Sequence, residues 1–199
     1  PWIKFENFDQ VLNNFIASYF AGALIIPRKS LTEKLTNFFS LEAWQPLELH
    51  KIIKGYNCSQ ETFYQRLTNI LPKYFHIKNL FFLRFMHKEN HFEYRLNKEL
   101  HITQQQAPHA NRNNEQYCRR WISIKTIQDL EKTSKTRPTF GAQISSYVDQ
   151  KNEYLVLSSA TKDPFKKDIN RSVSIGILLS PHLKKKLNFF HENTFPKRV

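Results

Sequence analysis

Glycine, cysteine and acidic side chains are scarce in this chain of 199 residues, and these shortages narrow the class of protein. Four glycines exclude collagen-like and glycine-rich low-complexity sequences. The two cysteines, Cys58 and Cys118, lie in unlike surroundings and do not form the pattern of a disulfide framework. We therefore expect the chain to fold around an ordinary hydrophobic core, for which 17 Phe and 8 Tyr provide the material.

Long apolar runs are missing as well. A membrane helix needs about 18 consecutive apolar residues, and residues 11–27 come closest but are interrupted by four small or polar side chains. The N-terminus has no basic region ahead of an apolar stretch, so it does not read as a signal peptide. We expect a cytoplasmic protein with no membrane partner and, because the chain begins at Pro1, a fragment of a longer one.

Positive charge is what the chain has in excess. Lysine and arginine number 30 against 17 aspartates and glutamates, which gives a net charge of +13. A field of this size favours an anionic partner such as nucleic acid, a phosphorylated ligand or an acidic protein surface. The alternative is that the basic side chains only coat a solvated surface.

The N-terminal part of the chain has the periodicity of helices. Apolar residues at helical spacing predict a helix over residues 7–26. Ser30 and Glu33 form a capping-box pattern, which predicts a second helix that begins there and runs to about Phe39.

A helix pair is predicted over residues 46–71. Pro46 suits the first turn of one helix, Gly55 breaks the chain, and Ser59 is a good N-cap for the next helix. Two helices joined by a short turn with glycine form the helix-turn-helix pattern, although most such pairs in proteins are plain packing units.

Beyond residue 76 the apolar period changes to two, which is typical of strands. We expect an α+β chain: helices first, then a mainly antiparallel sheet with flanking helices, of which a GAF-like domain is one form. The predicted strands are 80–86, 91–96, 140–148, 153–160 and 172–179, and the predicted helices are 123–131 and 181–190. The polar segment 97–116 is interpreted as a binding loop or, equally, a surface excursion.

The sequence carries no motif for catalysis or metal binding. No HExxH is present, and His191-Glu192 lacks the second histidine. Cys118 has basic neighbours that favour a thiolate, but no histidine or asparagine partner is identifiable, and a buried packing thiol is the alternative. We therefore expect no enzyme, no metal and no cofactor.

Residues 17–27 read AlaSerTyrPheAlaGlyAlaLeuIleIlePro. They resemble the segment that follows the zinc helix in the IrrE-type metallopeptidase-like family. That family places a glutamate, its third zinc ligand, three residues before the alanine that matches Ala17, and Asn14 occupies this position here. Since an amide is a poor substitute for a carboxylate on zinc, the resemblance implies a degenerate peptidase-like segment.

The order of segments is similar to that of transcriptional regulators with an Xre-type DNA-binding head, an IrrE-like region and a C-terminal sensor, among them short-chain fatty acyl regulators. The resemblance covers nearly the whole chain and is sharpest at 17–27, 46–71 and 117–123. Many relatives have a Cys-Pro-x-Trp-like sequence where this chain has Cys-Arg-Arg-Trp, which leaves the identity of the ligand open.

The resemblance divides the chain into three segments. Residues 1–42 correspond to the end of an IrrE-like helical region, and residues 43–74 to a helix-turn-helix-like linker pair. Residues 75–199 correspond to an α+β ligand-sensing domain. The resemblance further implies that the chain forms a homodimer and that the full-length protein binds DNA.

A ligand site is predicted where basic and aromatic side chains adjoin. Two neighbouring arginines offer planar forks for phosphate, and a tryptophan offers a flat face for a ring. Three residues of the following strand share one face by alternation, although a slip of one residue would reverse that face. The predicted ligand-binding residues are Tyr117, Cys118, Arg119, Arg120, Trp121, Gln143, Ser145 and Tyr147.

The leading hypothesis is therefore the effector-sensing region of a transcriptional regulator that binds an anionic metabolite such as a short-chain acyl coenzyme A. One alternative is a module that binds DNA directly through the helix pair, where amide and guanidinium side chains could read bases. The residues concerned are Gln60, Gln65, Arg66 and Asn69. A second alternative is the remnant of an IrrE-type metallopeptidase.

Overall fold

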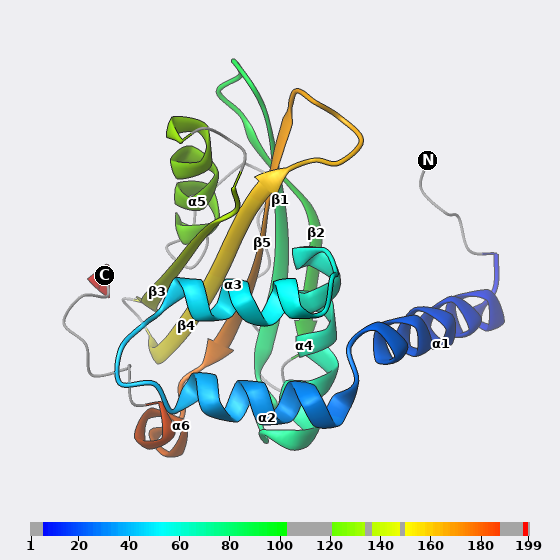
Figure 1. The fold of residues 1–199 in the computed structure, drawn as a ribbon, viewed down its shortest axis with the longest axis vertical. Coiled ribbons are helices and arrows are strands. Elements are labelled where there is room, and N and C mark those ends of the chain that lie inside the picture. Colours follow the sequence, from blue (N-terminus) through cyan, green and yellow to red (C-terminus); the bar gives the residue numbers. More distant parts are fainter. Residues whose placement is uncertain (1–5, 103–120, 134–136, 148–149, 188–196, 199) are drawn as a thin grey trace.

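The chain folds as four helices, a sheet and two further helices, in the α+β class that the sequence predicts. In the computed structural model (Figure 1) the described residues are 6–102, 121–133, 137–147, 150–187 and 197–198. The helices are α1 (Phe8–Ile25), α2 (Arg28–Phe39), α3 (Pro46–Gly55), α4 (Gln60–Tyr74), α5 (Trp121–Lys132) and α6 (Pro181–Lys186). The strands are β1 (Leu80–Lys88), β2 (Tyr94–Ile102), β3 (Thr139–Tyr147), β4 (Gln150–Lys162), β5 (Ile169–Leu178) and β6 (Lys197–Arg198).

The starts of the helices follow local chemistry, with one exception. Pro46 occupies the first turn of α3, and the hydroxyl of Ser59 accepts a hydrogen bond from the backbone N–H of Thr62 at the start of α4, as expected. The predicted capping box at Ser30 is wrong, because α2 begins directly after Pro27. The Ser30 hydroxyl instead forms a hydrogen bond of 2.9 Å with the phenol of Tyr56.

The strands form a single sheet in the order β2-β1-β5-β4-β3-β6. The pairs among β1 to β5 are all antiparallel, and the two-residue β6 pairs with β3 in parallel. The predicted boundary at residue 96 is wrong, since β2 continues to Ile102, which pairs with Leu80. The first residues of the polar segment 97–116 therefore belong to the sheet, because the nine-residue β1 offers them backbone partners.

Helices cover both faces of the sheet (Figure 1). On one face α2, α3 and α4 share a hydrophobic core with the strands, in which Leu35, Leu49 and Tyr64 are buried together with Phe82 and Ile175. This core contains residues from all three of the segments 1–42, 43–74 and 75–199 into which the resemblance divides the chain.

On the other face α5 packs against the strands through a second, smaller core. Its members include Ile127 and Leu130 of α5 and Phe81 of β1. The ring of Phe81 lies directly over Gly176 of β5, where an added Cβ would come within 2.0 Å of the ring. Any side chain at position 176 would therefore displace this ring.

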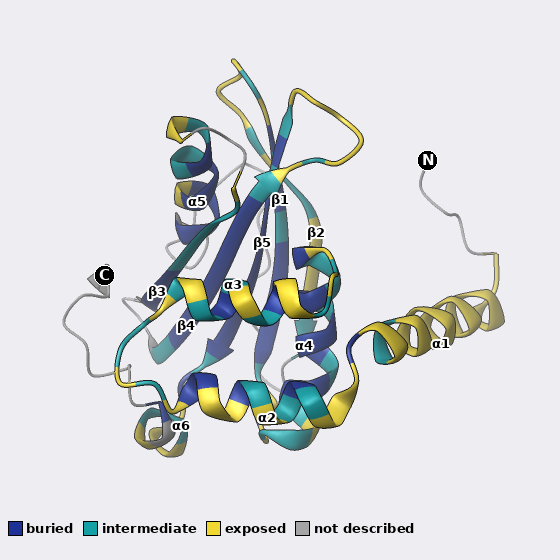
Figure 2. Cartoon of the chain, in the orientation of Figure 1, coloured by how far each residue is buried: buried dark blue, intermediate teal, exposed yellow. Residues whose placement is uncertain are grey.

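The first helix stands apart from this architecture. None of the residues of α1 is buried, and the helix projects from the body of the molecule (Figures 1 and 2). No single described helix is long and apolar enough to cross a membrane, whereas α1 and α2 together, bent by 68°, pass the same test on length and composition alone.

Candidate functional site

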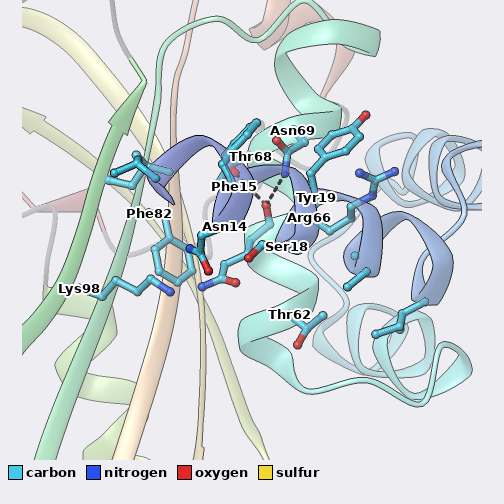
Figure 3. A pocket seen from close by; sticks show the side chains of 16 residues that line it. Asn14, Phe15, Ser18, Tyr19, Thr62, Arg66, Thr68, Asn69, Phe82 and Lys98 are labelled. Carbon is cyan, nitrogen blue, oxygen red and sulfur yellow. Dashed lines mark hydrogen bonds between the residues drawn. The ribbon is translucent and has the colours of Figure 1, made fainter. Parts of the chain in front are cut away.

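A groove of about 580 Å³ opens between α1, α4 and the strands β1 and β2, of which β2 forms the edge of the sheet (Figure 3). Its volume lies within the range typical of small-molecule pockets. The walls come from three parts of the chain that are distant in sequence. The lining residues are Val11, Asn14, Phe15, Ser18, Tyr19, Ala21, Gly22, Ile25, Thr62, Gln65, Arg66, Thr68, Asn69, Phe82, Lys98 and Leu100.

Two of the walls are largely apolar. On α1, Phe15 and Tyr19 stack against each other with ring centroids 6.3 Å apart. On the sheet, Phe82 of β1 and Leu100 of β2 are cross-strand partners, and both line the groove. The groove can therefore surround an apolar group on two sides.

The α4 wall is polar. In the close view (Figure 3) Thr68 and Asn69 turn toward their own helix, where both donate hydrogen bonds to the carbonyl of Gln65, at 2.7 Å and 3.3 Å. Their side chains thus have local partners, and the charged group on this wall is the guanidinium of Arg66.

Arg66 is a buried cation at the junction of α1 and α4. The side chain is 4% exposed, and its Nε donates to the carbonyl of Ile26, which caps α1. The guanidinium carbon lies 5.1 Å from the ring centroid of Tyr19. The Nη1 atom has no hydrogen-bond partner, and within the described part of the chain no carboxylate lies in salt-bridge range of this arginine.

A charge cluster flanks the other end of the groove. Glu61 accepts hydrogen bonds of 2.8 Å from Arg84 at both carboxylate oxygens and lies 3.3 Å from the Nζ of Lys98. Arg171 approaches the same carboxylate at 3.6 Å. Arg171 also lies 3.7 Å from Asp163, so three cations share two carboxylates and the cluster keeps an excess of positive charge.

The ionisation of Glu61 is set by this cluster. Burial opposes its charged form, but the hydrogen bonds from Arg84 and the charges of Arg84 and Lys98 outweigh burial and hold the pKa of Glu61 below its ordinary value. The carboxylate is therefore ionised near neutral pH and fixes Lys98 at the mouth of the groove.

The residues predicted for DNA contact all lie on α4, and packing covers much of that helix. Gln60 is 9% exposed and Arg66 is 4% exposed. Gln65 and Asn69 are half-buried and line the groove. A base-reading helix presents its polar side chains to the major groove, whereas α4 turns these side chains toward α1 and the sheet. Asn14, which the resemblance places opposite a zinc-binding glutamate of the IrrE-type family, lines the same groove from α1.

The predicted ligand residues lie elsewhere. Tyr117, Cys118, Arg119 and Arg120 are outside the described residues, as are the side chains of Trp121 and Tyr147. Gln143 and Ser145 of β3 share one face, as alternation predicts, and are 1% and 2% exposed. The amide of Gln143 donates to the hydroxyl of Ser145 at 3.0 Å. Both lie on the α5 side of the sheet, like Gly141, where an added Cβ would meet Ile122, so they are separated from the α1–α4 groove by the sheet itself.

Polar groups tie α5 to that side of the sheet. Nδ1 of His87 and Oε1 of Glu131 are 2.6 Å apart, and Nε2 of His87 lies 2.6 Å from the carbonyl of His91. Asn170 donates to the same carboxylate at 2.8 Å. Because both ring nitrogens of His87 are engaged, this cluster serves to hold α5 in place.

The sequence did not predict the groove, although the apolar residues of its α1 wall are evident in the sequence. Apolar residues occur on every side of α1, which shows that this helix has more apolar surface than one contact can cover. The position of Arg66 on the side of α4 that meets α1 depends on how the two helices cross. That crossing cannot be read from either helix alone.

Comparison with protein families, curated proteins and solved structures finds no match to this chain. Within the described ranges, no group of three His, Cys, Asp or Glu side chains is placed to hold a metal ion. Only the residues of the chain itself therefore indicate its function.

Proposed function

We propose that this chain is the effector-binding region of a transcriptional regulator, and that the α1–α4 groove binds an anionic molecule with an apolar part. A short-chain acyl coenzyme A or a fatty carboxylate has this chemistry. The regulatory role, with DNA bound by the full-length protein, is supported by the resemblance at residues 17–27 and along the order of segments. The ligand class is supported by the groove.

The observation that carries the proposal is the buried guanidinium of Arg66. Removing a charge from water is costly unless an opposite charge or hydrogen bonds compensate. Here one nitrogen bonds to the carbonyl of Ile26, another has no partner, and no described carboxylate lies in range. An anion in the groove would supply the missing negative charge, while Phe15 and Phe82 would cover its apolar part.

Binding at this place would act on the position of α1. The groove is bounded by α1 on one side and by α4 and the sheet on the other, so a ligand would contact both. A ligand that prefers one position of α1 shifts the population toward it, and this is how an effector alters the affinity of a distant site.

Calorimetry and thermal melting with butyrate, octanoate and their coenzyme A esters test this proposal. We expect at least one of these probes to bind the wild-type chain and to raise its melting temperature. Arg66→Met keeps much of the side-chain volume but removes the charge, so we expect binding to weaken at least tenfold. Lys98→Met, at a half-exposed position, should weaken binding without disturbing the fold.

The matched control is Arg95→Met, which removes a cation from an exposed pair with Glu93 on β2 and should leave binding unchanged. No binding by any of the four probes would overturn the proposal. Equal binding by wild type and by both Arg66→Met and Lys98→Met would show that the ligand lies elsewhere, for example near Gln143 and Ser145, and would overturn the assignment to this groove.

A further inference from the structure

The side of α1 that turns away from the groove is an exposed apolar stripe. It consists of Phe8, Leu12, Ile16, Phe20 and Leu24, at intervals of four residues, and we refer to it as the α1 stripe. Their exposed fractions are 73%, 40%, 53%, 62% and 66%. None of the five lines the groove. The exposed surface of α1 is visible in Figure 2.

The area of this stripe is that of a small protein interface. With about 150–250 Å² for an aromatic side chain, and a little less for leucine or isoleucine, the exposed fractions correspond to roughly 600 Å² per copy. Two such faces bury about 1,200 Å², the lower limit for a specific association. An exposed apolar patch of this size is at the upper end of what monomeric proteins carry, and such patches are often interaction sites.

Charge indicates which partner fits. The chain carries a net charge of +13, which makes two copies repel over most of their surfaces. Within α1 the only charged residue is Asp9, so this helix is a place where two copies can approach each other closely.

The ends of α1 also carry complementary charges. The exposed Glu6 and Asp9 lie at its start, and the exposed Arg28 and Lys29 lie directly beyond its end. In an antiparallel arrangement the acidic end of one helix meets the basic end of the other, and the helix dipoles are opposed.

We propose that the α1 stripe is a dimer interface, in which α1 of one copy packs antiparallel against α1 of a second copy. Apolar residues at intervals of four form a ridge along each helix, and the ridges of two packed helices interdigitate. The groove lies on the opposite side of α1 and stays open in this arrangement, so the dimer does not depend on the ligand proposed above.

A lipid surface is the competing occupant, and the chemistry of α1 is against it. Helices that lie in a membrane interface have a polar face rich in lysine and arginine, which anionic headgroups attract. The polar residues of α1 include one aspartate and no basic side chain.

Sedimentation equilibrium over a wide concentration range tests the proposal. We expect a reversible monomer–dimer equilibrium for the wild-type chain. Phe20→Glu and Leu24→Glu should each weaken dimerisation at least tenfold, because each places a buried, uncompensated charge in the interface. Both positions are exposed in the monomer, so circular dichroism should show an unchanged fold.

Matched controls lie outside the α1 stripe. Phe165→Glu and Leu47→Glu alter apolar residues that are more exposed than Phe20 and Leu24, at 91% and 69%, and should leave the equilibrium unchanged. A wild-type chain that is monomeric at all concentrations would overturn the proposal, and so would equal weakening by the controls. Co-sedimentation with anionic lipid vesicles that is lost in Phe20→Glu, without dimerisation in solution, would assign the stripe to a membrane instead.

A charge exchange tests the antiparallel orientation. Asp9→Lys alone and Lys29→Asp alone should each weaken the dimer, because each brings like charges together at the helix ends. The double variant should restore it, since every opposed pair is then again of opposite sign. Failure of the double variant to recover any affinity would overturn the antiparallel arrangement.

Discussion

Glu61 shows how one residue can organise several elements. It lies in the first turn of α4, yet its carboxylate contacts Arg84 of β1, Lys98 of β2 and Arg171 of β5. A carboxylate in the first turn also suits the positive end of the helix. This single side chain therefore joins the helical layer to three strands of the sheet.

The lowered pKa of Glu61 makes stability depend on pH. A glutamate that ionises more readily when folded stabilises the fold above its unfolded pKa of about 4.3, and this contribution is lost as the pH falls through the lower, folded value. Glu61→Gln should therefore reduce the free energy of unfolding by about 1–3 kcal/mol at pH 7. The difference should narrow steadily as the pH is lowered below about 4.3.

Urea denaturation at a series of pH values measures this effect. Glu93→Gln is the matched control, because the pair of Glu93 with Arg95 is exposed, and this substitution should change stability little at any pH. A constant difference between Glu61→Gln and the wild type at all pH values would contradict the expectation.

Among the elements, α4 is the one on which the others depend. It packs against β1 and β5 on one side and contacts α1 and α2 as well. Its apolar residues Phe63, Leu67 and Ile70 are buried, as their helical spacing predicts. The side of α4 that carries Arg66 is also covered, because α1 crosses it there.

The N-cap of α4 should matter for the stability of the whole fold. Ser59 accepts a hydrogen bond of 3.1 Å from the backbone N–H of Thr62. Ser59→Ala should lower the free energy of unfolding by about 1 kcal/mol, and Ser59→Asp, which keeps an acceptor at the cap, should restore most of it. The measurement is urea denaturation followed by circular dichroism; equal stability of the alanine and aspartate variants would contradict a capping role.

The sequence predicted the elements better than their ends. All five longer strands and all six helices were expected, because apolar periodicity reports them directly. The predicted capping box at Ser30 and the predicted end of β2 at residue 96 were wrong, because both depend on contacts with neighbouring elements. Ser30 forms a hydrogen bond with Tyr56, and residues 97–102 pair with β1 in the sheet.

At the scale of the whole molecule, the sheet is a central layer that helices cover on both sides. The core between α2–α4 and the sheet is the larger of the two and includes Leu80, Ile144 and Val173. These strand residues depend on the N-terminal helices for their cover. Among the described residues of 75–199, this side of the sheet is covered mainly by Leu183 and Leu187 at α6.

We therefore expect a fragment of residues 75–199 to fail to fold by itself. Without α2, α3 and α4, buried residues such as Phe82 and Ile175 would be exposed to water at a cost of about 1.5–3 kcal/mol each. The measurement is the dispersion of the amide resonances, compared with the intact chain. A well-dispersed spectrum from the fragment would contradict this expectation and would support the division at residues 74/75.

Apolar periodicity and helix caps in the sequence predicted the class of fold, the helices and the order of strands along the chain. The composition alone gave the excess of positive charge. These properties are local or additive, so they can be read without knowledge of which residues meet. The shared face of Gln143 and Ser145 belongs with them, because side chains alternate along any strand.

The groove, the burial of Arg66 and the isolation of the α1 stripe were decided by tertiary structure alone. Each depends on the angle between α1 and α2, which meet at Ile26 and Pro27, and on how α4 lies against the sheet. Arg66 looks like any solvated arginine of a helix until its guanidinium is seen beneath Tyr19 and against the carbonyl of Ile26. Contacts across 40 residues have no signature in the sequence, because they are produced by the packing of elements and not by the elements themselves.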